Sequence, residues 1–333
     1  MPTTPSALQA DRHVSDERGG GEVASALVNS TAVRLIAVYA LLVLIFGISA
    51  HNFLTTDNFL NIGRATSVFG IAALGVCVAL VAGSLDVSFG ATMSVCSIVA
   101  AEKIAAGHPL SYVLVYAICV GAILGAINGV LSTVLRIDSL VITLGTLSIF
   151  GGWAYLHTGG SPTNAPSSSF AEMGRGEWLG VPIQVWIMLG IALLLGFVLR
   201  FTTFGQRCYA AGDNPRAASI AGIHVGRVRI AALAISGITA AVAGMLIAAN
   251  AGVANPGTGE AYLLSAIAAV VIGGTSLTGG VGTILGTFVG IAVLGTIDNG
   301  LDLLGVSSFW EDAVRGGIVV LALVLDRLRR SAT

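Results

Sequence analysis

Long apolar segments alternate with short polar connections along most of the chain. Several of these segments reach about 17–24 residues, enough for a helix to cross a hydrocarbon core of about 30 Å. The pattern predicts an all-α, polytopic integral membrane protein with about ten transmembrane helices. The expected spans are about 33–49, 66–83, 88–104, 112–135, 139–157, 183–201, 228–250, 262–274, 281–299 and 309–326. The eighth is short and ends in two glycines, so a half-helix or a re-entrant segment is an alternative there.

Composition agrees with this class. Only 10% of the 333 residues are charged, against about 25% in soluble proteins. Residues 1–32 are polar and predict a disordered cytoplasmic tail without the layout of a cleaved signal peptide. The transmembrane domain is expected over 33–326, and a basic cytoplasmic tail over 327–333.

The basic residues predict the orientation. If the N-terminus is cytoplasmic and the spans alternate, twelve basic residues fall inside and four outside. The reverse arrangement would invert this bias, so both termini are expected in the cytoplasm. The largest outer loop, about 158–182, is rich in Gly, Ser, Pro and Asn. It is interpreted either as a plain connector or as a contact site for an external partner.

The longest polar interruption in the second half of the chain is Arg200–Arg229, with five arginines and one acid. Within it, Asn214 or Asp213 can cap a helix whose first position is Pro215. Gly222 then stands where a helix end favours glycine. The pattern predicts a short capped helix on the cytoplasmic side, suited to contact with a partner.

Few polar residues interrupt the apolar segments. Asp86 is the only acid between Arg64 and Thr92, and an ionisable group at a membrane suggests function. The alternative is that Asp86 or Ser88 caps the third span. The two roles can coexist.

Asn128 lies in the middle of the fourth span, beside a stripe of Gly121, Gly125 and Gly129 that lets another helix approach closely. Its amide either binds a solute hydroxyl or ties two helices together. The fifth span carries Thr143 and Thr146, which either form a polar wall for a hydroxylated solute or bond to their own helix.

Two further patterns bear on the fold. Asp138 is expected to cap the fifth span. A faint internal repeat relates Ser84-Leu85 and Gly90 to Ser276-Leu277 and Gly282, both in expected inner loops.

The sequence lacks the motifs that are typical of several classes of enzyme and nucleotide-binding protein. The sequence contains no G-x-x-x-x-G-K-[ST] phosphate-binding loop, no Ser/His/Asp set, no HExxH and no paired carboxylates. The four cysteines suggest neither a disulfide framework nor a metal site. We therefore expect no metal, no cofactor and no covalent catalysis by this chain.

Four stretches together resemble the membrane permease of bacterial ATP-binding-cassette (ABC) sugar importers, of the ribose/xylose/arabinose/galactose type. They are G-S-L-D-V-S-F-G at Gly83–Gly90, the run Asn128–Thr146, the basic stretch Phe204–Ile223, and A-I-A-A-V-V-I-G-G-T-S-L-T-G-G-V-G-T at Ala266–Thr283. The similarity extends from about residue 35 to 328.

The resemblance implies a multi-pass protein of the bacterial inner membrane. Its partners would be a second permease subunit, identical or paralogous, a cytoplasmic ABC ATPase and an extracytoplasmic sugar-binding protein, with no nucleic acid. The substrate would be a monosaccharide or a related polyol, which the sequence does not name. An ATP-independent secondary transporter of a neutral sugar or polyol is the alternative.

The resemblance also suggests two groups of site residues. The expected substrate pathway contains Asp86, Ser88, Asn128, Thr143 and Thr146. The ATPase-coupling loop is expected to act through Gly205, Arg207, Asn214, Pro215, Arg216, Ala217 and Gly222.

Overall fold

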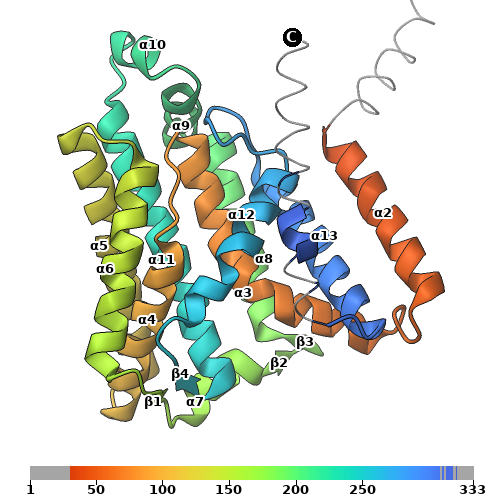
Figure 1. Ribbon diagram of the computed structural model, residues 1–333. Helices are drawn as coiled ribbons and strands as arrows, with labels where there is room; N and C mark the ends of the chain where they lie inside the picture. The colour runs from red at the N-terminus through yellow and green to blue at the C-terminus, as the bar shows by residue number, and fades with distance from the viewer. Residues whose placement is uncertain (1–30, 308–309, 311–312, 318–319, 321–333) are drawn as a thin grey trace, which may run out of the picture.

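The computed structural model describes residues 31–307, 310, 313–317 and 320 (Figure 1). The expected terminal tails lie almost wholly outside these residues, as does most of the tenth predicted span. The helices are α2 (Thr31–Ser49), α3 (Thr56–Val81), α4 (Phe89–Ala105), α5 (Leu110–Leu135), α6 (Ser139–Thr158), α7 (Ser168–Arg175), α8 (Ile183–Phe201), α9 (Thr203–Asp213), α10 (Pro215–Ile220), α11 (Val225–Ala251), η1 (Thr258–Tyr262), α12 (Leu263–Ile272) and α13 (Ile284–Leu303).

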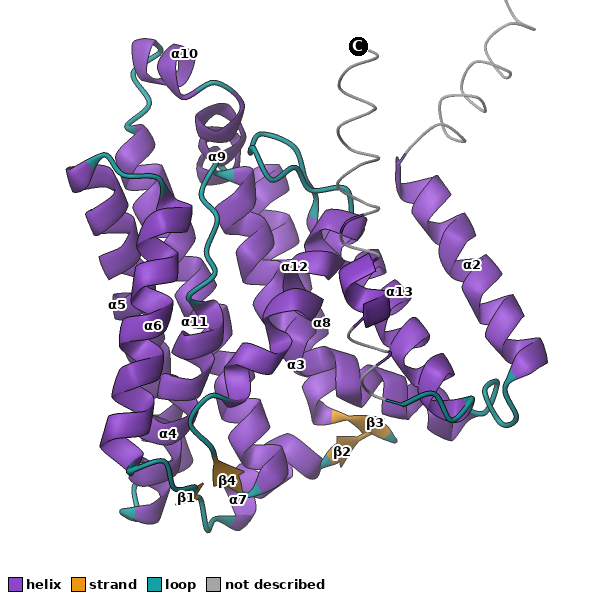
Figure 2. Ribbon diagram, viewed as in Figure 1, coloured by secondary structure: helices purple, strands orange, loops and turns teal. Residues whose placement is uncertain are grey.

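Strands are minimal. Two-residue pairs form between β1 (Thr163–Asn164) and β4 (Val253–Ala254), and between β2 (Glu177–Trp178) and β3 (Val181–Pro182). Figure 2 shows that helices make up the rest of the ordered architecture. The expected all-α class is confirmed.

Each of the first nine predicted spans coincides with a helix. Among the described residues, six helices are long and apolar enough to cross a membrane: α3, α5, α6, α8, α11 and α13. The protein is therefore a multi-pass membrane protein. Helix α3 begins ten residues before the expected span at 66, because the Thr55 side chain caps it by accepting from the Asn58 N–H.

The bundle has two distinct ends (Figure 1). Helices α9 and α10 lie at one end, here called the α10 end, while α7 and the strands lie at the opposite α7 end. Helices α3 and α11 run through the centre and contribute about half of the main buried apolar cluster. Helix α2 stands to one side and contacts α13.

The predicted glycine stripe on α5 packs against α11. A Cβ placed on Gly121 or Gly125 would lie within 3.0 Å of the α11 backbone, at Gly237 and Leu233 respectively. Larger side chains would force these helices apart, so the small residues allow the close approach that was expected.

The connection 158–182, expected to be an outer loop, is folded. Its helix α7 packs against the end of α11, where a Cβ on Gly174 would meet the backbone of Asn250. The side chain of Gln184, at the start of α8, donates a hydrogen bond to the Gly174 carbonyl. The segment therefore forms an ordered cover at the α7 end.

The polar stretch Arg200–Arg229 is more helical than expected. It contains α9 as well as the predicted short helix, which is α10. Thr202 caps α9 by accepting from the Gly205 N–H at 3.3 Å. One face of α9 is buried against the bundle through Gly205, Cys208 and Gly212. The interruption is thus an amphipathic helix followed by a small protruding one.

Candidate functional site

The connection from α3 to α4, here called the first broken segment (82–88), enters the bundle interior. Helix α3 ends at Val81, the chain turns at Gly83 with φ +74°, and it then runs back to α4 (Figure 1). Asp86 is 1% exposed and Ser88 is fully buried. The expectation of an inner loop here was wrong, because the polar side chains of the segment find partners inside the bundle.

A buried network surrounds Asp86. One carboxylate oxygen, Oδ1, accepts from the Ser88 N–H at 2.9 Å and from the Ser88 hydroxyl at 2.7 Å. The other, Oδ2, accepts from the Ser236 hydroxyl of α11 at 2.7 Å. The Asn128 amide of α5 donates to Ser88 Oγ at 2.7 Å. Three predicted pathway residues therefore meet at one point, joined by a serine that the sequence did not reveal.

Helix α6 holds the edge of the same segment. The Leu85 N–H donates to Ser139 Oγ at 2.9 Å, and the Thr143 hydroxyl donates to the Leu85 carbonyl at 3.2 Å. The Val87 N–H donates in turn to Thr143 Oγ1 at 3.3 Å. Thr146 instead bonds to carbonyls of its own helix, so it does not join the network.

A second broken segment (252–262) links α11 to α12 and enters from the opposite end of the bundle (Figure 1). This second segment packs against the start of α4, which follows the first broken segment, since a Cβ on Gly259 would lie within 3.0 Å of the Gly90 carbonyl. The Gly259 N–H also donates to Ser94 Oγ at 3.0 Å. A long helix, a broken segment and a shorter helix thus occur twice with opposite direction, which is an arrangement typical of transporters.

This pairing corrects the faint sequence repeat. The repeat related Ser84-Leu85 to Ser276-Leu277, but the second stretch lies in the connection 273–283 between α12 and α13. The structural counterpart of the first broken segment is 252–262, which enters the bundle from the opposite end and has different residues.

The centre offers hydrogen-bonding groups without a basic side chain among the described partners. It contains a carboxylate, an amide and hydroxyls, with the positive N-terminal end of α4 beside Asp86. The bonds from Ser236 and Asn128 connect the first broken segment to α11 and α5. The Asn128 Oδ1 atom is buried and has no hydrogen-bond partner among the described residues.

A polar cavity of about 430 Å³ opens beside the first broken segment at the α10 end. It lies between the α5–α6 turn and the start of α11, and hydroxyls of Ser84, Ser132, Thr133 and Ser139 contribute to its lining. Ser84 is 1% exposed, and its Oγ has no partner among the described residues. The cavity is large enough for a small solute and is polar enough to pair with one.

The predicted short helix has the expected caps. The Asn214 side chain accepts from the Ala217 N–H at 2.9 Å, Pro215 occupies the first position, and Gly222 follows the helix with φ +83°. Arg216 is exposed. The Asp138 cap on α6 is also confirmed by its bond from the Leu140 N–H at 2.8 Å.

Four glycines connect α9 with both neighbouring loops; we call Gly83, Gly212, Gly279 and Gly280 the glycine joint. Gly212 ends the buried face of α9, and its Cα lies against the backbone of Gly83 and Gly280. The Gly280 N–H donates to the Val81 carbonyl at 3.1 Å. Helix α9 is therefore in direct backbone contact with the start of the first broken segment.

Two side chains support this joint. The Tyr209 hydroxyl of α9 donates to the Gly282 carbonyl at 2.8 Å, and burial raises its pKa. Arg229 Nε donates to the Ala82 carbonyl at 3.4 Å.

Two of the expected coupling residues lie on α9. Gly205 lies on the buried face of this helix, whereas Arg207 is exposed.

The comparisons with known proteins identify the family of the chain. A family model described as "Branched-chain amino acid transport system / permease component" matches residues 58–323. The chain belongs to this permease family. The ribose import permease protein RbsC of Bacillus subtilis is 38% identical over 86% of this chain and 90% of its own length. RbsC of Escherichia coli K12 is 36% identical over 88% and 94%.

A third relative of this permease is the L-arabinose ABC transporter permease protein AraH of Azospirillum brasilense. It is 31% identical over 99% of this chain and 95% of its own length. No solved structure matches the chain. The resemblance to ABC sugar-importer permeases is confirmed by these relatives.

Proposed function

We propose that the chain is the membrane permease subunit of an ATP-driven importer for a monosaccharide or related polyol. It pairs with a second permease, identical or paralogous, in the bacterial inner membrane. A cytoplasmic ABC ATPase supplies the energy, and an extracytoplasmic sugar-binding protein delivers the solute. The printed names of the relatives support sugar as the substrate class, although the family description refers to amino acids.

The observation that carries the proposal is the buried Asp86 network of the first broken segment, with the second broken segment packed against the start of the adjoining helix α4. Transporters commonly place their solute site where discontinuous helices of opposite direction meet. A neutral, hydroxyl-rich solute suits a centre of carboxylate, amide and hydroxyl groups, since each can exchange a protein partner for a sugar hydroxyl. The unpartnered Asn128 Oδ1 is the first acceptor available to such a solute.

The polar cavity extends this path toward the α10 end. Gly83 and Ser84 line the cavity, while Asp86 and Ser88 of the same segment belong to the network. A solute released from the network would meet the Ser84, Thr133 and Ser139 hydroxyls next. We assign the cavity as the exit of the pathway.

Basic residues support a cytoplasmic α10 end. The turns and helices at this end contain Arg136, Arg200, Arg207, Arg216 and Arg227. Short loops rich in arginine favour the cytoplasmic side. The exposed, capped α10 then faces the cytoplasm and is the surface that an ATPase would contact, with Arg216 and Ala217 at its front.

The glycine joint connects the proposed ATPase-contact surface on α10 with the Asp86 network. Nucleotide-driven movement of the ATPase would displace α10 and α9 as a unit. Gly212 would transmit the displacement to Gly83, and the first broken segment would shift against α5, α6 and α11. The Asp86 network would break on one side and re-form, so the pathway opens to the two sides in turn.

The test is affinity purification of the tagged chain from its native membrane in mild detergent. We expect an ABC ATPase to co-purify with a pair of permease chains, together with a sugar-binding protein. Purification of the chain alone, with sugar uptake by ATP-free liposomes, would support the secondary transporter instead.

A further inference from the structure

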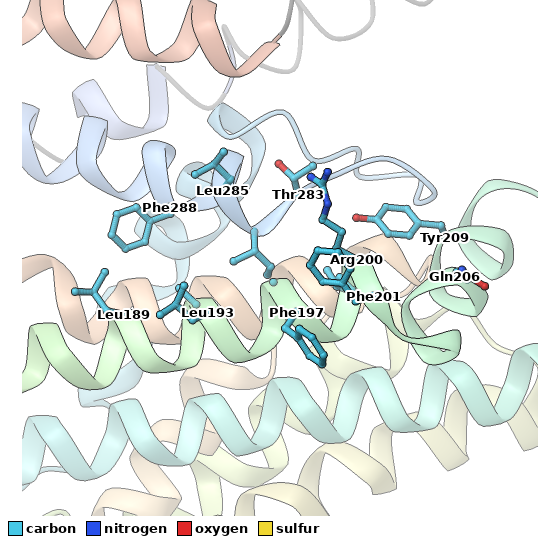
Figure 3. Close-up of a pocket in the computed structure, with 14 residues that line it drawn as sticks. Leu189, Leu193, Phe197, Arg200, Phe201, Gln206, Tyr209, Thr283, Leu285 and Phe288 are labelled. Carbon is cyan, nitrogen blue, oxygen red and sulfur yellow. The ribbon is translucent and has the colours of Figure 1, made fainter.

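A second cavity, unlike the first, is apolar and lies between α8 and α13. Its volume is about 850 Å³, and Figure 3 shows the residues that line it. Leu189, Leu193 and Phe197 line it from α8, while Leu285 and Phe288 line it from α13. Such a lining cannot satisfy the hydroxyls of a sugar, so the groove is separate from the proposed pathway.

One end of the groove is polar. Arg200, at the last turn of α8, lies there with Gln206, Tyr209 and Thr283 (Figure 3). The fourteen lining residues include no acid, and no carboxylate among the described residues pairs with the Arg200 guanidinium. A cation at the head of an apolar groove complements an amphiphile with an anionic head group.

The depth of the groove also fits a lipid. Leu189 and Arg200 are eleven helical positions apart, which is about 16 Å along the axis. The hydrocarbon core is about 30 Å thick, so the groove covers about one leaflet, with the guanidinium at head-group level. Basic pockets between transmembrane helices are known to hold anionic lipid head groups.

From this geometry we propose that the α8–α13 groove binds an anionic phospholipid. The phosphate contacts Arg200 and the hydroxyl of Thr283, and an acyl chain lies along Leu193, Phe197 and Phe288. The bound lipid fills the space between α8 and α13 and lies beside Tyr209 of α9. This proposal does not depend on the identity of the transported solute or of the energy source.

The experiment uses the full-length chain in phosphatidylcholine vesicles with a photoactivatable phosphatidylglycerol that carries a diazirine in its acyl chain. We expect labelling of α8 and α13 peptides, with competition by unlabelled phosphatidylglycerol and none by added phosphatidylcholine. Arg200→Gln should lower labelling about fivefold, the factor expected for one basic side chain at an anionic membrane surface.

Two variants complete the design. Arg227→Gln removes an equally exposed arginine from the same end but outside the groove, and it should leave labelling unchanged. Gly196→Leu should abolish labelling although Arg200 remains. The new Cβ fits without a clash, since its nearest neighbour is Ile284 at 3.8 Å, and the rest of the leucine side chain fills the groove.

Three results would overturn the proposal. The first is equal labelling of the wild type and Arg200→Gln. The second is equal competition for labelling by phosphatidylglycerol and phosphatidylcholine. This comparison needs only the wild-type protein, so it remains valid if a variant fails to fold. The third is cross-linking of benzoylphenylalanine at Leu193 to a second copy of the chain, or to its own residues 309–326, in place of lipid.

Discussion

Replacement of Gly212 by alanine tests the link between α9 and the first broken segment. The added Cβ would stand within 3.0 Å of the Val81 carbonyl oxygen and the Gly280 nitrogen, and 3.1 Å from the Gly83 nitrogen. Ordinary van der Waals contact begins at 3.4 Å. All three contacts are with backbone, which cannot rotate away as a side chain can, so the glycine joint must open.

The free-energy cost of Gly212→Ala can be estimated from the known cost of overpacking a protein interior. One extra methyl group in a tightly packed region costs about 1–3 kcal/mol, and 1.4 kcal/mol changes an equilibrium about tenfold. Alanine is otherwise favoured over glycine in a helix such as α9. We therefore expect Gly212→Ala to lower transport about tenfold or more, through the joint and not through loss of the helix.

The assay is uptake of radiolabelled D-ribose and L-arabinose by cells that express the whole importer, normalised to permease abundance in the membrane. The matched control is Gly190→Ala on α8, where nothing lies within 4 Å of the new Cβ and uptake should remain normal. Normal uptake by Gly212→Ala, at normal abundance, would refute the role of the joint.

Three further predictions concern other parts of the site. Asn128→Leu should reduce uptake more than abundance, because it removes both the bond to Ser88 Oγ and the free Oδ1; full uptake would make Asn128 purely structural. Gly222→Asp and Pro215→Leu should leave the protein in the membrane but uncouple ATP hydrolysis from uptake, since they disturb the ends of α10; unchanged uptake and substrate-stimulated ATPase in both would contradict this. Cys208 should resist maleimide at neutral pH and react only after unfolding, because burial raises the pKa of its thiol to about 12 and the thiolate is the nucleophile; rapid labelling of the native protein, located by mass spectrometry, would show that α9 is not packed as described.

Local signals predicted local structure well. The Asn214–Pro215 start and the Gly222 end of α10 use only groups that are neighbours in the chain, and the Asp138 cap does the same. The glycine stripe on α5 was also informative, because a repeated absence of side chains leaves few functions besides close packing.

The depth of the first broken segment could not be predicted. In the hydropathy pattern, Gly83–Gly90 is a short interruption between apolar runs. The pattern is the same whether the segment lies at the surface or folds back into the bundle. The position of the segment depends on its hydrogen-bond partners, which come from distant positions in the chain: Ser139, Asn128 and Ser236. A lone serine in an apolar helix such as α11 carries no signal, since it can always bond to its own backbone.

Helix α9 was missed for a different reason. Its low apolar content placed it within a polar interruption, although a Thr202 cap and small or apolar residues at Gly205, Cys208 and Gly212 follow a helical face. The expected coupling residues on it therefore divide into two kinds. Gly205 is buried against the bundle, whereas Arg207 is exposed.

The central claim is that this permease opens its pathway only when an ATPase acts on the α10 end. The most direct measurement is sugar uptake into proteoliposomes that contain the purified permease, its ATPase and its binding protein, with and without enclosed hydrolysable ATP. We predict uptake that requires ATP hydrolysis and that Gly212→Ala lowers about tenfold or more. Equal uptake without ATP would contradict the claim and identify a secondary transporter.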